Sequence, residues 1–122
     1  MSTRVLIAED EPNIIESLKF IFSREGWDVT AVMDGRAAMQ RLQADPPDVI
    51  ILDVMLPLLN GFEILKQVRA NPKLYKLPVI MLTAKGQTQD RQTALEIGAN
   101  LFVTKPFSNK EVVENVRRLT QG

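Results

Sequence analysis

The sequence predicts an α/β fold, in which a doubly wound and mostly parallel sheet carries helices on both faces. Three observations indicate it: short apolar runs recur five times along the 122 residues, helix-like stretches separate them, and the links are short. Apolar runs without polar alternation are typical of strands buried on both faces, as in a parallel sheet. The five runs are Val5–Ala8, Val29–Val32, Val49–Leu52, Val79–Leu82 and Leu101–Val103.

The first three helices have their own start and stop signals. Pro12 can open the first helix, whose apolar positions fall on one face, and Gly26 is a plausible end. Asp34 is the expected cap of the second helix, "GRAAMQRLQAD". Gly61 precedes the third, "FEILKQVRAN", in which the apolar residues also form a stripe.

The last two helices complete the alternation of strands and helices. The stretch "QTQDRQTALEIGAN" should form a helix that ends at Gly98. The final helix should begin near Ser108, which has capping-box spacing with Glu111. Parallel strands joined by helices in this way imply right-handed crossovers.

Composition excludes several function classes. Fifteen basic and fifteen acidic residues give no net charge, so we expect neither direct nucleic-acid binding nor attraction to an anionic membrane. The absence of Cys and His excludes disulfides, a phosphohistidine carrier, a Ser-His-Asp triad and the metal sites that these residues build. The start "MSTRVLIAED" is no secretory signal and no segment is long enough to span a bilayer, so we expect a cytoplasmic protein.

Polar side chains follow four of the apolar runs, where the crevice of such a sheet lies. They are Glu9 and Asp10, Asp53, Thr83, and Thr104 with Lys105. Three carboxylates brought together would repel one another unless a divalent cation or an ammonium lay among them. Oxygen ligands without His or Cys suit a hard ion such as Mg²⁺, and Lys105 supplies a positive charge.

Each of these residues also has an ordinary explanation when taken alone. Glu9 and Asp10 could be a solvated loop or a helix cap, and Asp53 a turn former. Thr83 could be a β-branched strand residue and Lys105 a surface lysine. Their conjunction at one edge of the sheet is what favours a functional site.

These motifs resemble the receiver domains of two-component response regulators over essentially the whole chain. "LIAEDEP" is similar to the acidic-pair motif, "ILDVMLP" to the phosphoacceptor motif and "NGFEIL" to the helix that follows it, while "MLTAKG" resembles the hydroxyl motif and "GANLFVTKPF" the lysine–proline motif. The resemblance implies one receiver domain over residues 1–122. It also implies a flavodoxin-like, five-stranded parallel sheet with strand order 2-1-3-4-5.

The resemblance assigns a role to each carboxylate of the predicted site. Glu9 and Asp10 would hold Mg²⁺, and Asp53 and the backbone carbonyl of Met55 would complete the protein ligands. Asp53 would be the phosphoacceptor. The phosphoryl donor would be a histidine kinase or a phosphohistidine carrier, and the output partner is unknown.

The resemblance also implies how the signal is read. Thr83 and Lys105 would contact the phosphoryl oxygens, and Phe102 would be the aromatic switch, although an ordinary half-buried aromatic is the alternative for Phe102. The Lys105–Pro106 bond should be cis. The protein would then be a phosphorylation-dependent switch rather than a turnover enzyme.

Two groups of residues bear on phosphoryl lifetime and dimerisation. Met55 and Lys85 stand where fast-hydrolysing members resembling chemotaxis receivers carry polar or acidic side chains, so we expect a longer-lived phosphoryl group. The charged face through which receivers of winged-helix transcription factors pair would comprise Arg91, Glu96, Glu111 and Arg117. A solvated surface is the alternative, because Leu101 and Asn115 replace the acid and base usual there.

Three other functions compete with a phosphorylated switch. A flavodoxin-like cofactor-binding module needs a Gly/Ser/Thr-rich loop after the first strand, but this chain has "EDEPN". A nucleotide hydrolase needs the G-x-x-x-x-G-K-[ST] loop, which the sequence lacks. The third is a receiver-like adaptor that is never phosphorylated, and only a phosphorylation assay separates it from the switch.

Overall fold

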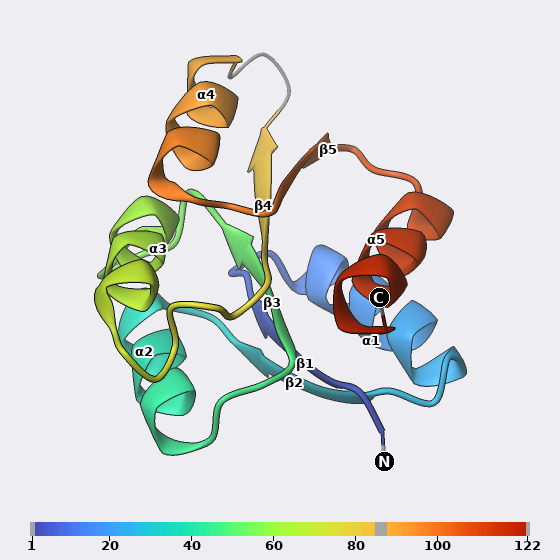
Figure 1. Cartoon of the computed structure of the whole chain (residues 1–122). Coiled ribbons are helices and arrows are strands. Elements are labelled where there is room, and N and C mark those ends of the chain that lie inside the picture. The colour runs from blue at the N-terminus through green and yellow to red at the C-terminus, as the bar shows by residue number, and fades with distance from the viewer. Residues whose placement is uncertain (1, 85–87, 122) are drawn as a thin grey trace.

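The computed structural model describes residues 2–84 and 88–121, and over these it confirms the predicted α/β fold (Figure 1). Strands and helices alternate along these residues. The elements are β1 (Arg4–Ala8), α1 (Pro12–Arg24), β2 (Asp28–Val32), α2 (Gly35–Ala44), β3 (Val49–Asp53), α3 (Gly61–Ala70), β4 (Val79–Ala84), α4 (Thr88–Ile97), β5 (Leu101–Lys105) and α5 (Asn109–Gln121).

The five strands form one parallel sheet in the order β2-β1-β3-β4-β5, which is the predicted order. Figure 1 shows helices α2, α3 and α4 on one face of this sheet and α1 and α5 on the other. Strand β3 is central and all five of its residues are buried, because helices cover both of its faces.

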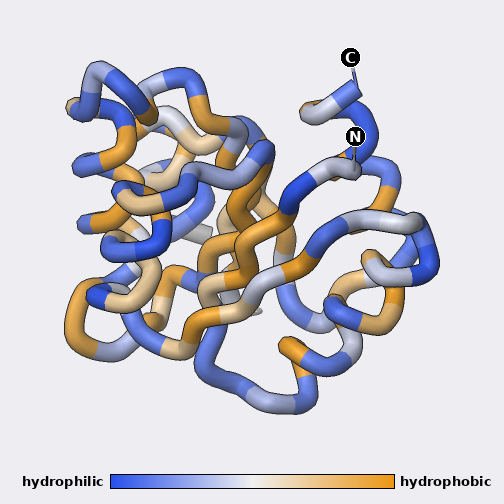
Figure 2. Tube along the Cα trace, turned by 90° about the horizontal axis from the view of Figure 1, so that it is seen from below, coloured by the Kyte–Doolittle hydropathy of each residue, from blue (hydrophilic) through white to orange (hydrophobic). Residues whose placement is uncertain are grey.

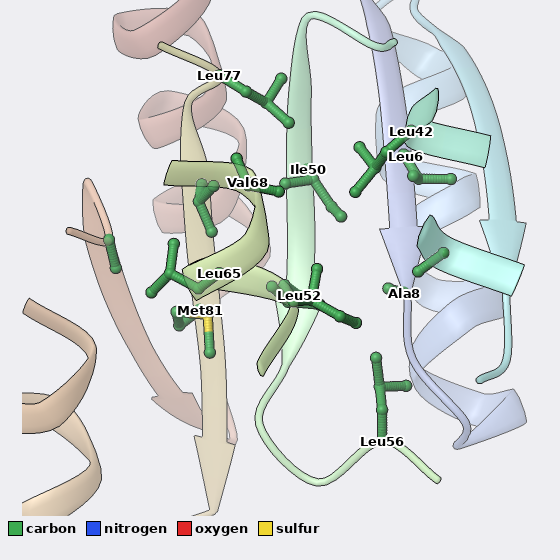
Figure 3. Packing of buried hydrophobic residues seen from close by; sticks show 14 of the residues in the cluster. Leu6, Ala8, Leu42, Ile50, Leu52, Leu56, Leu65, Val68, Leu77 and Met81 are labelled. Carbon is green, nitrogen blue, oxygen red and sulfur yellow. The ribbon is translucent and has the colours of Figure 1, made fainter. Parts of the chain in front are cut away.

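Apolar side chains fill the space between the sheet and each helical layer. The hydropathy trace is apolar along the strands and mostly polar at the outer turns (Figure 2). On one face, Leu42 of α2 and Leu65 of α3 pack with Ile50 and Leu52 of β3 (Figure 3). Each such fully buried side chain contributes about 1.5–3 kcal/mol relative to exposure, so the sheet is a firm base for its loops.

Side-chain caps fix where three helices begin. Asp34 accepts a hydrogen bond from the backbone N–H of Ala37 at 2.8 Å, as predicted for the second helix. Glu111 N donates to Ser108 Oγ at 3.1 Å, which confirms the predicted start of α5. Asn60 and Glu63 form a capping box at the start of α3, which was not predicted from the sequence.

Three strands extend one or two residues past the carboxyl end of the predicted apolar runs. β3 includes Asp53, β4 runs to Ala84 and β5 runs to Lys105. An apolar pattern ends at the last apolar residue, but backbone pairing continues regardless of side-chain polarity. The polar residues therefore belong to the last paired positions of the strands rather than to the loops that follow them.

Candidate functional site

The carboxyl ends of β1, β3 and β5 bring the predicted site residues to one edge of the sheet. Asp53 pairs in register with Leu82 of β4, and Lys105 with Ala84. Gly61, the first residue of α3, packs so closely that a β-carbon there would lie 2.4 Å from the carbonyl oxygen of Asp53. This contact fixes the end of β3 against the start of α3.

Glu9 is fully buried directly after β1. Its Oε2 accepts hydrogen bonds from the backbone N–H groups of Asp10 at 3.0 Å and Glu11 at 3.2 Å. Its Oε1 lies 2.9 Å from Lys105 Nζ, but it has no hydrogen bond of acceptable geometry among the described residues. One buried carboxylate oxygen is thus only partly compensated.

Asp53 is buried beside the same ammonium. Its Oδ2 lies 3.4 Å from Lys105 Nζ, and its Oδ1 accepts a hydrogen bond from Met55 N at 3.2 Å. Carboxylate oxygens of Glu9, Asp10 and Asp53 all lie within 4.8 Å of one another. The structure therefore brings together the three acids and the lysine that the strand ends predicted.

The electrostatics of the cluster follow from burial and proximity. Burial, followed by the close approach of the Asp53 carboxylate, raises the pKa of Glu9 to about 7. Burial by itself would lower the pKa of Lys105, but the neighbouring carboxylates of Glu9 and Asp53 outweigh it and the pKa is raised. Lys105 is therefore a permanent cation at neutral pH, whereas Glu9 is partly protonated when no metal balances it.

Thr83 is buried at the end of β4, next to the acids. Its hydroxyl donates a hydrogen bond of 3.3 Å to Asp90 Oδ2 on α4. A hollow of about 610 Å³ opens here, and its lining includes Asp10, Met55, Thr83 and Asp90. Thr83 therefore shares this hollow with Asp10 of the acidic cluster.

The remaining predicted site residues lie around this core. Phe102 on β5 is half-buried and packs on the same cluster as α2, α3 and α4. Met55 exposes 72% of its surface beside the hollow. Lys85 lies outside the described residues. The Lys105–Pro106 peptide bond is cis, as predicted.

The proposed dimer residues are all exposed, but two of them have partners within the chain. Glu96 accepts a hydrogen bond from Gln92 at 3.2 Å on the same helix. Arg117 of α5 forms an ion pair with Glu25, which follows α1. Arg91 and Glu111 are exposed on α4 and α5.

Two residues near the site were missed from the sequence. Asp90 holds the Thr83 hydroxyl, and Glu11 Oε1 accepts a hydrogen bond from Lys105 Nζ at 3.4 Å. The only sequence signal for Asp90 is an acid in the first turn of a helix, which is common at that position. Glu11 lies within the acidic "EDE" run, but the run does not show which acid faces the lysine.

A comparison with known families supports what the geometry indicates. The profile of the response regulator receiver domain matches residues 5–117. The chain belongs to this family. It is a receiver domain of a two-component system and takes part in signal transduction. Receiver domains are signalling switches rather than turnover enzymes.

Individual relatives agree with this family. The alkaline phosphatase synthesis transcriptional regulatory protein PhoP of Bacillus subtilis is 40% identical over 119 residues, which are 98% of this receiver domain and 49% of that protein. The chain therefore spans about half the length of this curated relative.

Solved structures are similar over the whole fold. A putative response regulator from Chloroflexus aurantiacus has a TM-score of 0.95 and 32% identity, with both chains fully covered. The receiver domain of the sensor histidine kinase PA1611 from Pseudomonas aeruginosa has a TM-score of 0.91 and 29% identity, again with both chains fully covered. That structure has a magnesium ion coordinated in its active-site cleft. Among the described residues of the present chain, no helix is both long and apolar enough to cross a bilayer.

Proposed function

We propose that this receiver domain is a phosphorylation-dependent switch whose phosphoacceptor is Asp53. The observation that carries the proposal is the position of the buried Asp53 carboxylate, 3.4 Å from Lys105 Nζ and within 4.8 Å of the Glu9 and Asp10 carboxylates. A histidine kinase or a phosphohistidine carrier would donate the phosphoryl group. The domain would comprise residues 1–122.

The acidic cluster fits a divalent cation. All its side-chain ligands are oxygens, which suit Mg²⁺, and Glu9 Oε1 is buried without a hydrogen-bond partner in the described part of the chain. Glu9, Asp10, Asp53 and the backbone carbonyl of Met55 would hold the ion, with water completing its shell. When bound, Mg²⁺ supplies positive charge that neutralises the phosphoryl oxygens.

The chemistry of transfer needs no general base. An Asp53 oxygen attacks phosphorus and forms a new oxygen–phosphorus bond, while the nitrogen–phosphorus bond of the donor's phosphohistidine breaks and its electron pair stays on the imidazole ring. Lys105 stabilises the negative oxygens, and the close packing of Gly61 holds Asp53 in place.

The signal would start at Thr83 and end at Phe102. The Thr83 hydroxyl now bonds Asp90 on α4, so a phosphoryl oxygen that takes this hydroxyl removes a link between β4 and α4. Phe102, half-buried on the same face, would then turn inward and change the surface that a partner binds. The output partner of this surface is unidentified.

A homodimer belongs to the same proposal. Arg91 and Glu111 are exposed and available for pairing through α4 and α5. Glu96 would have to leave Gln92, and Arg117 would have to leave Glu25. Sedimentation with and without phosphorylation tests it. A phosphorylated protein that stays monomeric at every concentration would exclude this dimer.

A direct phosphorylation assay tests the function. Incubation with Mg²⁺ and acetyl phosphate or phosphoramidate should add one phosphoryl group, measured by intact mass. Asp53→Asn should abolish the addition, and Asp28→Asn, an exposed aspartate at the start of β2, should not. Labelling that survives Asp53→Asn would refute the acceptor assignment, and an unlabelled parent would favour an adaptor that is never phosphorylated.

Two further measurements test the site residues. Asp10→Asn should weaken Mg²⁺ binding in a titration followed by NMR, because it removes a ligand charge. Met55→Asn with Lys85→Glu should speed dephosphorylation at fixed Mg²⁺. The Asn and Glu side chains can accept a hydrogen bond from the attacking water, whereas a thioether is a poor acceptor and an ammonium accepts none. An equal or slower rate would show that these positions do not control the attacking water.

A further inference from the structure

Three carboxylates surround the ammonium of Lys105. Nζ lies 2.9 Å from Glu9 Oε1 and 3.4 Å from both Asp53 Oδ2 and Glu11 Oε1. Within the described ranges, the hydrogen bond that Lys105 Nζ donates goes to Glu11. The lysine expected to hold phosphoryl oxygens is therefore engaged by an acid that has no part in the proposed metal site.

The position of Glu11 in its helix makes this contact unusual. Glu11 is the N-cap residue of α1, yet its side chain makes no capping hydrogen bond, and Glu is not among the preferred N-cap residues. Its backbone serves the helix start, since its carbonyl accepts hydrogen bonds from Ile14 N and Ile15 N, both at 3.1 Å. The carboxylate is left to reach across to β5.

Glu11 is far more exposed to solvent than the lysine that it contacts. The Glu11 side chain is 59% exposed and that of Lys105 only 15%. Both residues line a hollow of about 510 Å³ beside the acceptor site, together with Ile14 and Phe107. A small anionic phosphoryl donor that approaches through this hollow meets the Glu11 charge.

We propose that Glu11 is a positioning residue that restrains Lys105 and so limits how fast Asp53 accepts a phosphoryl group. This inference rests on the proposed function. During transfer the Lys105 ammonium would move toward the phosphoryl oxygens, and its hydrogen bond to Glu11 opposes that movement. The Glu11 charge adds repulsion toward an anionic donor.

Glu11→Gln is the main test, because it removes the charge at nearly constant shape. Since Lys105 Nζ lies 3.4 Å from both carboxylates, the Glu11 and Asp53 oxygens in question are at most about 7 Å apart. Repulsion in water between the Glu11 charge and one unit of negative charge on a donor at Asp53 corresponds to roughly a threefold change in the rate of phosphorylation. Phosphorylation by acetyl phosphate and Mg²⁺ at low salt should therefore be at least about threefold faster, and an equal or slower rate refutes the proposal.

Glu11→Asp is the matched control that separates the loss of the contact with Lys105 from the loss of the negative charge. It keeps the charge but is one methylene shorter, so it should not reach Lys105, and its rate should rise toward that of Glu11→Gln. If Glu11→Asp reacts like the parent while Glu11→Gln is faster, the effect is repulsion alone and the restraint is wrong.

A measurement without metal separates this inference from the proposed function. In the metal-free protein, exchange of the Lys105 ammonium protons with water, followed by NMR, should be faster in both Glu11 variants than in the parent. Unchanged exchange in both variants overturns the restraint even if phosphorylation occurs. A parent protein that is not labelled at Asp53 overturns the proposed function, and the exchange measurement still decides the role of Glu11.

Discussion

Gly61→Ala should disturb the acceptor site more than its small size suggests. A β-carbon at residue 61 would lie 2.4 Å from the carbonyl oxygen of Asp53, 3.0 Å from its carbonyl carbon and 3.0 Å from Met81 Cε. The methionine end can move, but the two backbone atoms belong to the central strand. The start of α3 and the end of β3 therefore have to separate.

The expected cost follows from this overlap. Adding a methyl group to a well-packed site typically costs about 1–3 kcal/mol, and here the strain falls on backbone. Gly61 N also donates to Val54 O at 3.0 Å, so the loop after Asp53 would move with the helix. Displacing a reacting group by about 1 Å can cost about a hundredfold in rate, so we expect acceptance at Asp53 to fall by roughly ten- to a hundredfold.

Gly26→Ala is the matched control, since it makes the same chemical change at a remote site. A β-carbon at Gly26 would meet nothing within 4 Å, but its φ of +81° strains any other residue and should cost about 1 kcal/mol. Urea unfolding and the rate of labelling by acetyl phosphate should be measured for both variants. If Gly61→Ala matches the parent in both, or if Gly26→Ala slows labelling as much, the reasoning about Asp53 fails.

Three further predictions concern stability. In metal-free protein, the pKa of Glu9 is raised to about 7, so its contribution to the free energy of unfolding is complete at low pH and is lost as the pH rises through 7. Between pH 5 and 8, the free energy of unfolding measured in urea should therefore fall by up to about 3 kcal/mol more in the parent than in Glu9→Gln. Leu58, which is exposed with a φ of 71°, should gain about 1 kcal/mol as Leu58→Gly but nothing as Leu58→Ala in the same assay. Arg69 donates hydrogen bonds to three backbone carbonyls and to Asn100 Oδ1. Arg69→Lys should therefore be less stable by about 2–4 kcal/mol in thermal unfolding. An unchanged stability would show that this hydrogen-bond network is dispensable.

The features predictable from the sequence are those that one segment encodes by itself. Val49–Leu52 is apolar on both faces, which already requires a strand between two layers of helices. Asp34 predicted a helix start because capping needs only neighbouring residues. Strand ends were less predictable, since ladder pairing continues through Asp53 and Lys105 whatever their polarity.

Contacts between distant segments were beyond the sequence reading. Lys105 reaches Glu11 across 94 positions, and nothing in either segment shows that the lysine contacts Glu9 and Glu11 of the acidic run. Thr83 and Asp90 are close in sequence, but their hydrogen bond depends on how α4 packs against β4. Such pairings are decided by the direction in which each side chain leaves its strand or helix, which residue patterns do not record.

The charge balance among the three carboxylates and Lys105 explains why this site suits a divalent cation. The sequence indicated that three carboxylates at one sheet edge need a counter-charge, and Lys105 is the cation that the fold supplies. One ammonium does not suffice, because the pKa of Glu9 is still raised to about 7 and its Oε1 lacks a hydrogen bond in the part of the chain described. Complete ionisation of Glu9 at neutral pH therefore requires more positive charge than the described residues provide. A divalent cation held by these same oxygens meets that requirement, and for this reason metal binding and readiness of Asp53 to accept a phosphoryl group should rise together.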